Sequence, residues 1–168
     1  MLKANIIEKL NAQVNAEMFA SNLYLQMAAW CEDKGLAGAA EFFKKHVPEE
    51  LAHRDKFIHY LFECGAPVRI GALDAPRADY NNLVEVIEAA YAHEQKVTAM
   101  INDIANLALD ERDFNTFNML QWFIAEQREE EVLFRGILDQ IALVAFKGQS
   151  GEAMFHINQH LQRLAQTL

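Results

Sequence analysis

Apolar residues recur at alternating spacings of three and four along four long stretches of this 168-residue chain, which is the period of one face of an α-helix. Alternation with a period of two, which would indicate β-strands, is nearly absent. The pattern predicts helices over residues 5–33, 38–64, 80–109 and 113–143, with a short one over 150–165. Gly35 and Gly38 mark the first turn, and Asp113 stands where a helix N-cap is needed. The chain is therefore predicted to be all-α.

One connection between predicted helices is much longer than the others. Residues 65–80, GAPVRIGALDAPRADY, hold two of the three prolines and exceed the length of a tight turn between neighbouring antiparallel helices. We interpret this segment as a crossover that joins two helical hairpins into a four-helix bundle. The segment KGQS, residues 147–150, separates off the short fifth helix. Since neither a repeat nor a change of composition divides the chain, residues 1–168 are predicted to form a single domain.

The charge of the chain restricts its partners. Fifteen basic and 24 acidic residues give a net charge of −9, which repels nucleic acid and anionic lipid and attracts cations. The amino-terminal stretch lacks the apolar segment of a secretory signal, and no run is long enough to span a membrane. We expect a cytoplasmic protein with no nucleic-acid or membrane partner. Cys31 and Cys64 stand alone and are interpreted as reduced thiols.

A carboxylate interrupts the apolar stripe of each long predicted helix near its middle. Aromatic and aliphatic residues flank each carboxylate on its stripe, and no lysine or arginine occupies the stripes. The four residues are Glu17, Glu50, Glu94 and Glu130. Because an unpaired carboxylate inside a bundle costs several kcal/mol, four of them at one level predict a bound cation. The alternative is a helical phase shifted by one residue, which would leave a glutamate on a solvated face, and agreement across four helices argues against it.

The residue types around these carboxylates indicate which metal they would bind. His53 follows Glu50 at the Glu-x-x-His spacing of di-iron carboxylate bundles. A second Glu-x-x-His is expected on the fourth helix, where this chain has Gln127-x-x-Glu130. One imidazole among several carboxylates suits iron or manganese better than zinc or copper, and we expect iron. Two ions about 3.5–4 Å apart, bridged by Glu50, could reduce one dioxygen together.

Pro48 lies inside the second predicted helix, immediately before this motif. A proline in a helix interior costs about 3 kcal/mol because it removes one hydrogen bond and crowds a carbonyl. At 3.6 residues per turn it falls roughly 200° from His46 and Glu50, on the side away from the core. We expect a tolerated kink. The alternative is that local loosening lets Glu49 or Glu50 move between iron positions.

At these residues the chain resembles the bacterial non-haem ferritins over its whole length, including the fifth helix. The matching stretches are NAEMFASNLYLQMAAW (15–30), EELAHRDKF (49–57), AHEQKV (92–97), FNTFNMLQWFIAEQREEEVLF (114–134) and SGEAMFHINQHL (150–161). The resemblance implies a ferritin-like four-helix bundle with one long crossover and a short fifth C-terminal helix. It also implies a homo-oligomeric shell of twenty-four subunits that oxidises ferrous iron with dioxygen and stores a ferric mineral.

The resemblance implies a role for each site residue. The first iron would be held by Glu17, Glu50 and His53, and the second by Glu50, Glu94 and Glu130. Gln127 matches a glutamine beside the iron pair and is counted among the metal-binding residues, and Tyr24 matches a tyrosine that could orient a ligand and supply an electron. A third, weaker iron site would use Glu49, Glu126 and Glu129, which from the sequence alone are also readable as ordinary surface glutamates.

Haem is not expected. Bacterioferritins, the haem-containing relatives, carry a methionine ligand directly after the glutamate of the second-helix motif, where this chain has Leu51. The alternative function is an iron-binding storage shell with little intrinsic catalysis, and an iron-independent structural protein comes third. His156 and His160 lie four apart and are either a metal pair or ordinary packed or exposed residues. His46, His59 and His93 have no partner at ligand spacing and are assigned no role.

Overall fold

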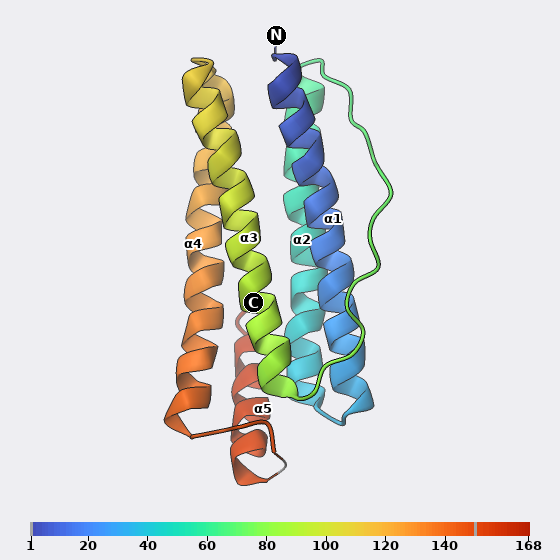
Figure 1. The fold of residues 1–168 in the computed structure, drawn as a ribbon, viewed down its shortest axis with the longest axis vertical. Helices are drawn as coiled ribbons and strands as arrows, with labels where there is room; N and C mark the ends of the chain where they lie inside the picture. Colours follow the sequence, from blue (N-terminus) through green and yellow to red (C-terminus); the bar gives the residue numbers. More distant parts are fainter. Residues whose placement is uncertain (1, 150) are drawn as a thin grey trace.

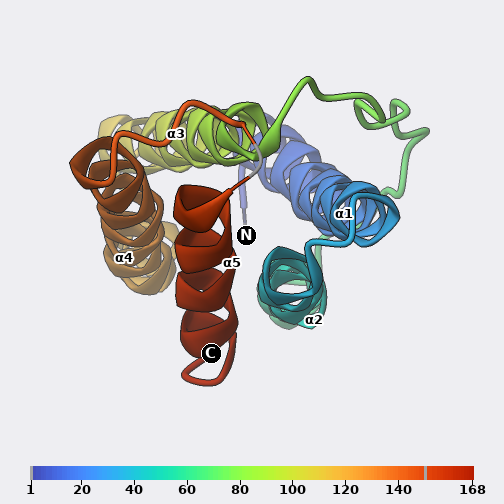
Figure 2. The same cartoon turned by 90° about the horizontal axis from the view of Figure 1, so that it is seen from below.

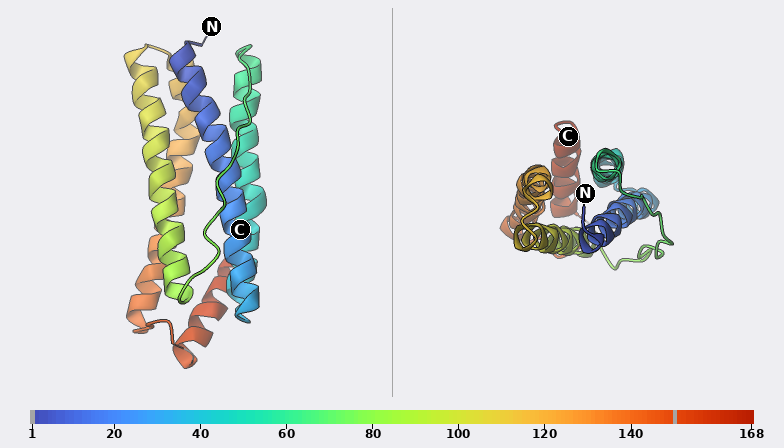
Figure 3. Two further views of the ribbon diagram at one scale, coloured as in Figure 1. Left: turned by 45° about the vertical axis from the view of Figure 1, so that its right-hand side comes forward. Right: turned by 90° about the horizontal axis from the view of Figure 1, so that it is seen from above.

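A computed structural model describes residues 2–149 and 151–168, and this part of the chain contains five α-helices and no strand. The helices are α1 (Ala4–Asp33), α2 (Ala37–Glu63), α3 (Leu83–Asp110), α4 (Phe114–Leu143) and α5 (Glu152–Ala165). Helices α1 to α4 lie side by side as two antiparallel hairpins, and the long connection between α2 and α3 runs beside α1 (Figures 1 and 3). The predicted four-helix bundle with one crossover and a short fifth helix is confirmed.

Capping residues set the helix boundaries. Helix α3 begins at Leu83 because the Asn82 side chain accepts a hydrogen bond from the Glu85 amide at 3.1 Å, so the predicted start at residue 80 is wrong by three residues. Asp113 is the predicted N-cap of α4 and accepts a hydrogen bond from the Thr116 amide at 3.1 Å. Helix α5 begins at Glu152, and its predicted first residue, Ser150, lies outside the described residues.

Two asparagines of α1 fasten the crossover along its path. Asn11 donates to the Pro67 carbonyl at 3.0 Å and accepts from the Arg69 amide at 2.5 Å. One turn later, Asn15 donates to the Arg69 carbonyl at 2.9 Å and accepts from the Gly71 amide at 2.7 Å. Each side chain thus pairs with crossover backbone as a neighbouring strand would. This pairing satisfies polar backbone groups of a segment that has no secondary structure.

Helix α5 covers one end of the bundle, between α2 and α4 (Figure 2). It approaches α2 so closely that a Cβ atom on Gly38 would collide with the Asn158 carbonyl oxygen. The Asn158 side chain also accepts a hydrogen bond from the Ala39 amide at 3.0 Å. Gly38, predicted only to mark a turn, is therefore a contact point between two helices.

The apolar core is divided into two clusters along the bundle. One cluster lies toward α5 and includes Tyr24, Phe43 and Phe134, and the other lies toward the amino terminus and includes Leu10 and Phe57. Along every long helix, the predicted inward carboxylate lies between residues of the two clusters. The fold therefore surrounds a polar centre with apolar packing at both ends.

Pro48 lies inside α2 and is exposed, as its predicted position away from the core requires. The helix continues without interruption from Ala37 to Glu63. Nearby, the Ser21 hydroxyl of α1 donates to the Val47 carbonyl at 3.1 Å, which ties α2 to α1 beside the proline. Among the described residues, no helix combines the length and the apolar character that crossing a membrane would need.

Candidate metal centre

Four glutamates, one from each long helix, occupy the polar centre of the bundle. They are Glu17 of α1, Glu50 of α2, Glu94 of α3 and Glu130 of α4, and none is more than 5% exposed. In the described part of the chain, none of the four forms an ion pair with a lysine or arginine. Four buried carboxylates without a cationic side chain form a centre that attracts metal ions.

Glu17, Glu50 and His53 form the first group of ligand atoms. Each offers one ligand atom, and these atoms all lie within 4.8 Å of one another. The His53 Nδ1 atom is 3.4 Å from Glu50 Oε2. Gln13, one turn before Glu17, donates from Nε2 to Glu17 Oε1 at 2.8 Å, whereas Glu17 Oε2 has no hydrogen-bond partner. One oxygen of Glu17 is thus fixed and the other is free to bind an ion.

Glu94 is held from two sides. The Tyr24 hydroxyl donates to its carboxylate, and Gln127 Nε2 donates to Glu94 Oε2 at 3.0 Å. Burial raises the pKa of Tyr24 well above its usual value, as do the charges of the neighbouring glutamates. The hydroxyl therefore stays protonated and remains a donor. Tyr24 and Gln127 orient the carboxylate of α3 toward the centre.

Two further groups of ligand atoms lie beside the first. Glu49, His53 and Glu126 each place one ligand atom within 4.8 Å of the others, and His53 Nε2 is 3.9 Å from Glu126 Oε1. One ligand atom from each of His46, Glu49 and Glu130 likewise lies within 4.8 Å of the other two. Glu129, assigned by resemblance to the third iron site, belongs to neither group. Its side chain is 72% exposed and lies 3.9 Å from Arg128 Nη2.

Burial controls the electrostatics of the metal-free centre. It raises the pKa of Glu17 to about 7 and, together with the charges of nearby glutamates, that of Glu130 to about 9. The pKa of Glu50 is raised well above its usual value by burial and by Glu94. Burial lowers the pKa of His53 to about 4, so its imidazole is neutral at pH 7. The metal-free centre thus retains protons at neutral pH, and a bound cation would replace them.

Unpartnered buried atoms provide a test of whether a metal fits. Glu17 Oε2, Glu130 Oε2 and His46 Nε2 are buried and lack a hydrogen-bond partner. Two are carboxylate oxygens, and the third is an imidazole nitrogen whose partner nitrogen is already engaged. Since buried polar atoms are normally paired, these free acceptors suit a cation bound among them. The donor set of carboxylates and imidazole agrees with the iron or manganese expected from the sequence.

Two residues of the centre were missed by the sequence prediction. His46 was assigned no partner, yet its Nε2 lies 3.7 Å from Glu130 Oε2. The signal was present, because His46 stands one turn before Glu50 on the same stripe. Gln13 carries a similar signal one turn before Glu17, although a glutamine at that spacing is too common to be diagnostic.

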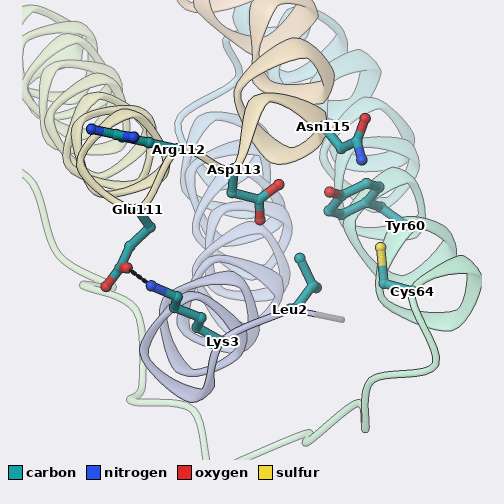
Figure 4. A pocket seen from close by; sticks show the side chains of 8 residues that line it. All are labelled: Leu2, Lys3, Tyr60, Cys64, Glu111, Arg112, Asp113 and Asn115. Carbon is teal, nitrogen blue, oxygen red and sulfur yellow. Dashed lines mark hydrogen bonds and ion pairs between the residues drawn. The ribbon is translucent and has the colours of Figure 1, made fainter.

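A separate pocket of about 300 Å³ opens at the end of the bundle, where α1 begins and α3 meets α4 (Figure 4). Two of its polar contacts are made within the protein. Lys3 pairs with Glu111, and the Tyr60 hydroxyl lies 2.8 Å from Thr116 Oγ1. Neither this pocket nor any group of three ligand atoms in the described residues includes His156 or His160. The carboxylate centre is therefore the functional site that the fold favours.

Comparison with known proteins agrees with this geometry. The family described as Ferritin-like domain matches residues 7–144. The chain is 43% identical over 165 residues to a probable bacterial non-heme ferritin-like protein of Haemophilus influenzae, with 98% of each chain covered. It is also 43% identical over 164 residues to the bacterial non-heme ferritin of Escherichia coli O157:H7, with 98% of each chain covered. An open pore ferritin from the hyperthermophilic archaeon Archaeoglobus fulgidus superposes with a TM-score of 0.90 at 31% identity, covering 96% of this chain and 98% of that one.

The match extends through the four long helices that carry the centre and, in the relatives, over nearly the full chain. The resemblance noted in the sequence is thereby confirmed. With its five-helix architecture and its buried carboxylates, this chain belongs to the ferritin family.

Proposed function

We propose that the protein is an iron store with ferroxidase activity, which oxidises Fe(II) with dioxygen at the buried carboxylate centre. The observation that carries this proposal is the convergence of one buried glutamate from each of four helices, none of them paired with a lysine or arginine among the described residues. Membership of the ferritin family and relatives described as bacterial non-heme ferritins support iron as the substrate.

In the proposed reaction, two ferrous ions bind side by side. Glu17 and His53 would hold one ion, Glu94 and Glu130 the other, and Glu50 would bridge them. Each ion gives up one electron, so the pair supplies two electrons to one dioxygen molecule. In this scheme Gln13 and Tyr24 do not bind iron, and Gln127, predicted from the sequence as a metal-binding residue, is given an orienting role because its Nε2 donates to Glu94. They hold the carboxylates of Glu17 and Glu94 in place through the hydrogen bonds described above.

A third, weaker iron site is proposed next to the pair. Glu49, His53 and Glu126 have ligand atoms within 4.8 Å of one another, which supports this site. The exposed side chain of Glu129 would need to swing away from Arg128 to join it. The side chains of Glu126 and Glu129 are 22% and 72% exposed, so this site would lie nearer to solvent than the iron pair.

We further propose that the chain acts as one ferritin-like domain within a cytoplasmic homo-oligomeric shell, of twenty-four subunits by resemblance. Large exposed apolar side chains support contacts between subunits, among them Leu25, Ile70, Phe114 and Leu143. The net charge of −9 supports iron rather than nucleic acid as the cargo. No haem is proposed, since Leu51 stands where the haem-binding relatives have a methionine ligand.

The second candidate is a shell that binds and stores iron with little catalysis of its own. The centre has candidate ligands from four helices and orienting residues that are held by hydrogen bonds. This completeness favours ferroxidase activity over storage alone. Stopped-flow oxidation of Fe(II), with oxygen consumption recorded alongside, distinguishes the two. The Glu50→Ala, Glu94→Ala double variant should lose rapid oxidation, whereas the matched exposed pair Glu41→Ala, Glu88→Ala on the same helices should retain it. If the two double variants oxidised Fe(II) at equal rates, the centre would not be the site of oxidation, and the storage shell with little catalysis would be favoured.

A further inference from the structure

His46 is the buried polar side chain at the centre that has no role in the proposed reaction. It lies on α2, one turn before Glu50, and is fully buried. The rings of Phe42, Tyr24 and Phe134 surround it, with centroids 4.6, 5.2 and 5.6 Å from the imidazole. An aromatic enclosure of this kind keeps water away and holds the ring in one orientation.

The hydrogen bond of His46 determines which of its nitrogens is free. Nδ1 lies 3.0 Å from the Phe42 carbonyl oxygen. A carbonyl oxygen only accepts, so Nδ1 carries the proton of this bond and Nε2 of the neutral ring presents a lone pair. Burial lowers the pKa of His46 to about 4, which keeps the imidazole neutral at physiological pH. A histidine whose Nδ1–H bonds a backbone carbonyl has the orientation typical of a metal ligand that binds through Nε2.

The free nitrogen faces the carboxyl group of Glu130, and no hydrogen-bond donor lies within bonding distance of it. His46 Nε2 is 3.7 Å from Glu130 Oε2, and neither atom has a hydrogen-bond partner. Glu49 contributes a third atom within 4.8 Å of both. Two ligands bound about 2.0–2.2 Å from one ion lie roughly 3–3.7 Å apart at common coordination angles. The separation is too long for a hydrogen bond and fits two atoms that share an ion.

We propose that His46 is a metal ligand, which binds a divalent transition ion through Nε2 together with Glu130 and Glu49. This inference rests on the proposed function, because the ion lies in or beside the proposed second iron position. It also accounts for a departure from the expected ligand pattern. The fourth helix lacks a second Glu-x-x-His, and the imidazole that such a motif would supply comes here from α2.

Cobalt(II) provides a test that does not depend on oxidation. Crystals of the assembled protein are soaked in Co²⁺ and the ions are located by anomalous scattering, while equilibrium dialysis gives their affinities in solution. The expected result is one ion near His53 and another about 2.0–2.3 Å from His46 Nε2. Loss of an outer hydrogen-bond partner already weakens metal sites 10- to 100-fold, so His46→Phe should weaken the second ion by at least about tenfold.

The variants are chosen so that folding does not decide the outcome. His46→Phe places a ring of similar size among the same aromatic residues, and His46→Gln retains a polar group. His59→Gln, at an exposed histidine of the same helix, is the matched control and should bind cobalt as the wild type does. An ion at His53 with none at His46, or unchanged affinities in both His46 variants, would overturn this inference alone. Absence of cobalt at both histidines would overturn the proposed metal centre as well.

Discussion

The stability advantage of a Glu130→Gln variant over the wild type should increase as the pH rises, when both proteins are free of metal. Glu130 is 5% exposed, and burial with the nearby charges of Glu94 and Glu49 raises its pKa to about 9. In the unfolded chain the same carboxyl titrates near 4.5. Between these two values the folded protein binds one more proton than the unfolded chain at this position. The contribution of Glu130 to stability is therefore fully present below pH 4.5 and is lost as the pH rises toward 9.

The size of this effect follows from the proton difference. One proton corresponds to about 1.4 kcal/mol of unfolding free energy per pH unit. From pH 5 to pH 8, wild-type protein should thus lose about 4 kcal/mol relative to Glu130→Gln, in which the position does not titrate. The amide also changes local hydrogen bonds, but that change is nearly the same at every pH. The informative quantity is therefore the slope of the stability difference with pH.

Urea unfolding of metal-free protein at pH 5, 6, 7 and 8 measures this slope. Glu129→Gln is the matched control, because Glu129 lies one residue away on α4 and its side chain is 72% exposed. For Glu129→Gln, the plot of unfolding free energy against pH should run parallel to that of the wild type. Parallel plots for Glu130→Gln and the wild type would refute the reasoning. Glu130 would then ionise in the folded protein with no loss of unfolding free energy.

Three further changes test the supports of the centre and the crossover. Tyr24→Phe removes the hydroxyl donor of Glu94 and should lower the unfolding free energy by about 1–3 kcal/mol in urea, and an unchanged value would mean that the bond contributes nothing. In the Asn11→Ala, Asn15→Ala double variant, the unfolding free energy should fall by about 2–4 kcal/mol and trypsin should cleave within residues 65–80. Resistance to trypsin equal to that of the wild type would contradict the role of these side chains in holding the crossover. Pro48→Ala should stabilise the protein by up to about 3 kcal/mol with unchanged oxidation and iron-transfer kinetics, whereas altered kinetics would favour the alternative that the proline lets neighbouring glutamates move.

The architecture could be predicted from the sequence because its signals are local or periodic. The spacing of apolar residues defines four helices, and the length of residues 65–80 requires a crossover. The start of α3 was missed because the apolar pattern continues past the capping residue Asn82. The path of the crossover could not be predicted from the sequence either. Asn11 and Asn15 read as ordinary polar residues of α1 until the backbone that they bind is known.

Much of the centre could be predicted for the same reason. Periodicity alone brings Glu17, Glu50, Glu94 and Glu130 to the inside of four helices at one level. The contribution of His46 depends on facts that spacing does not contain, namely the bond of Nδ1 to a carbonyl and the distance of Nε2 from a residue of another helix. The role of Glu129 in the third site stays a prediction, because its side chain is 72% exposed and lies outside the groups of ligand atoms.

The stoichiometry of rapid Fe(II) oxidation tests the central claim most directly. Iron is added anaerobically in steps to the metal-free protein, each sample is mixed with oxygenated buffer, and the amplitude of the fast phase is recorded. The two iron positions that are proposed to share Glu50 predict an amplitude that rises to about two Fe(II) per subunit and then levels off. The Glu50→Ala, Glu94→Ala variant should show no such phase. An amplitude that grows without a break, or a fast phase that survives in the variant, would contradict oxidation at the buried carboxylate centre.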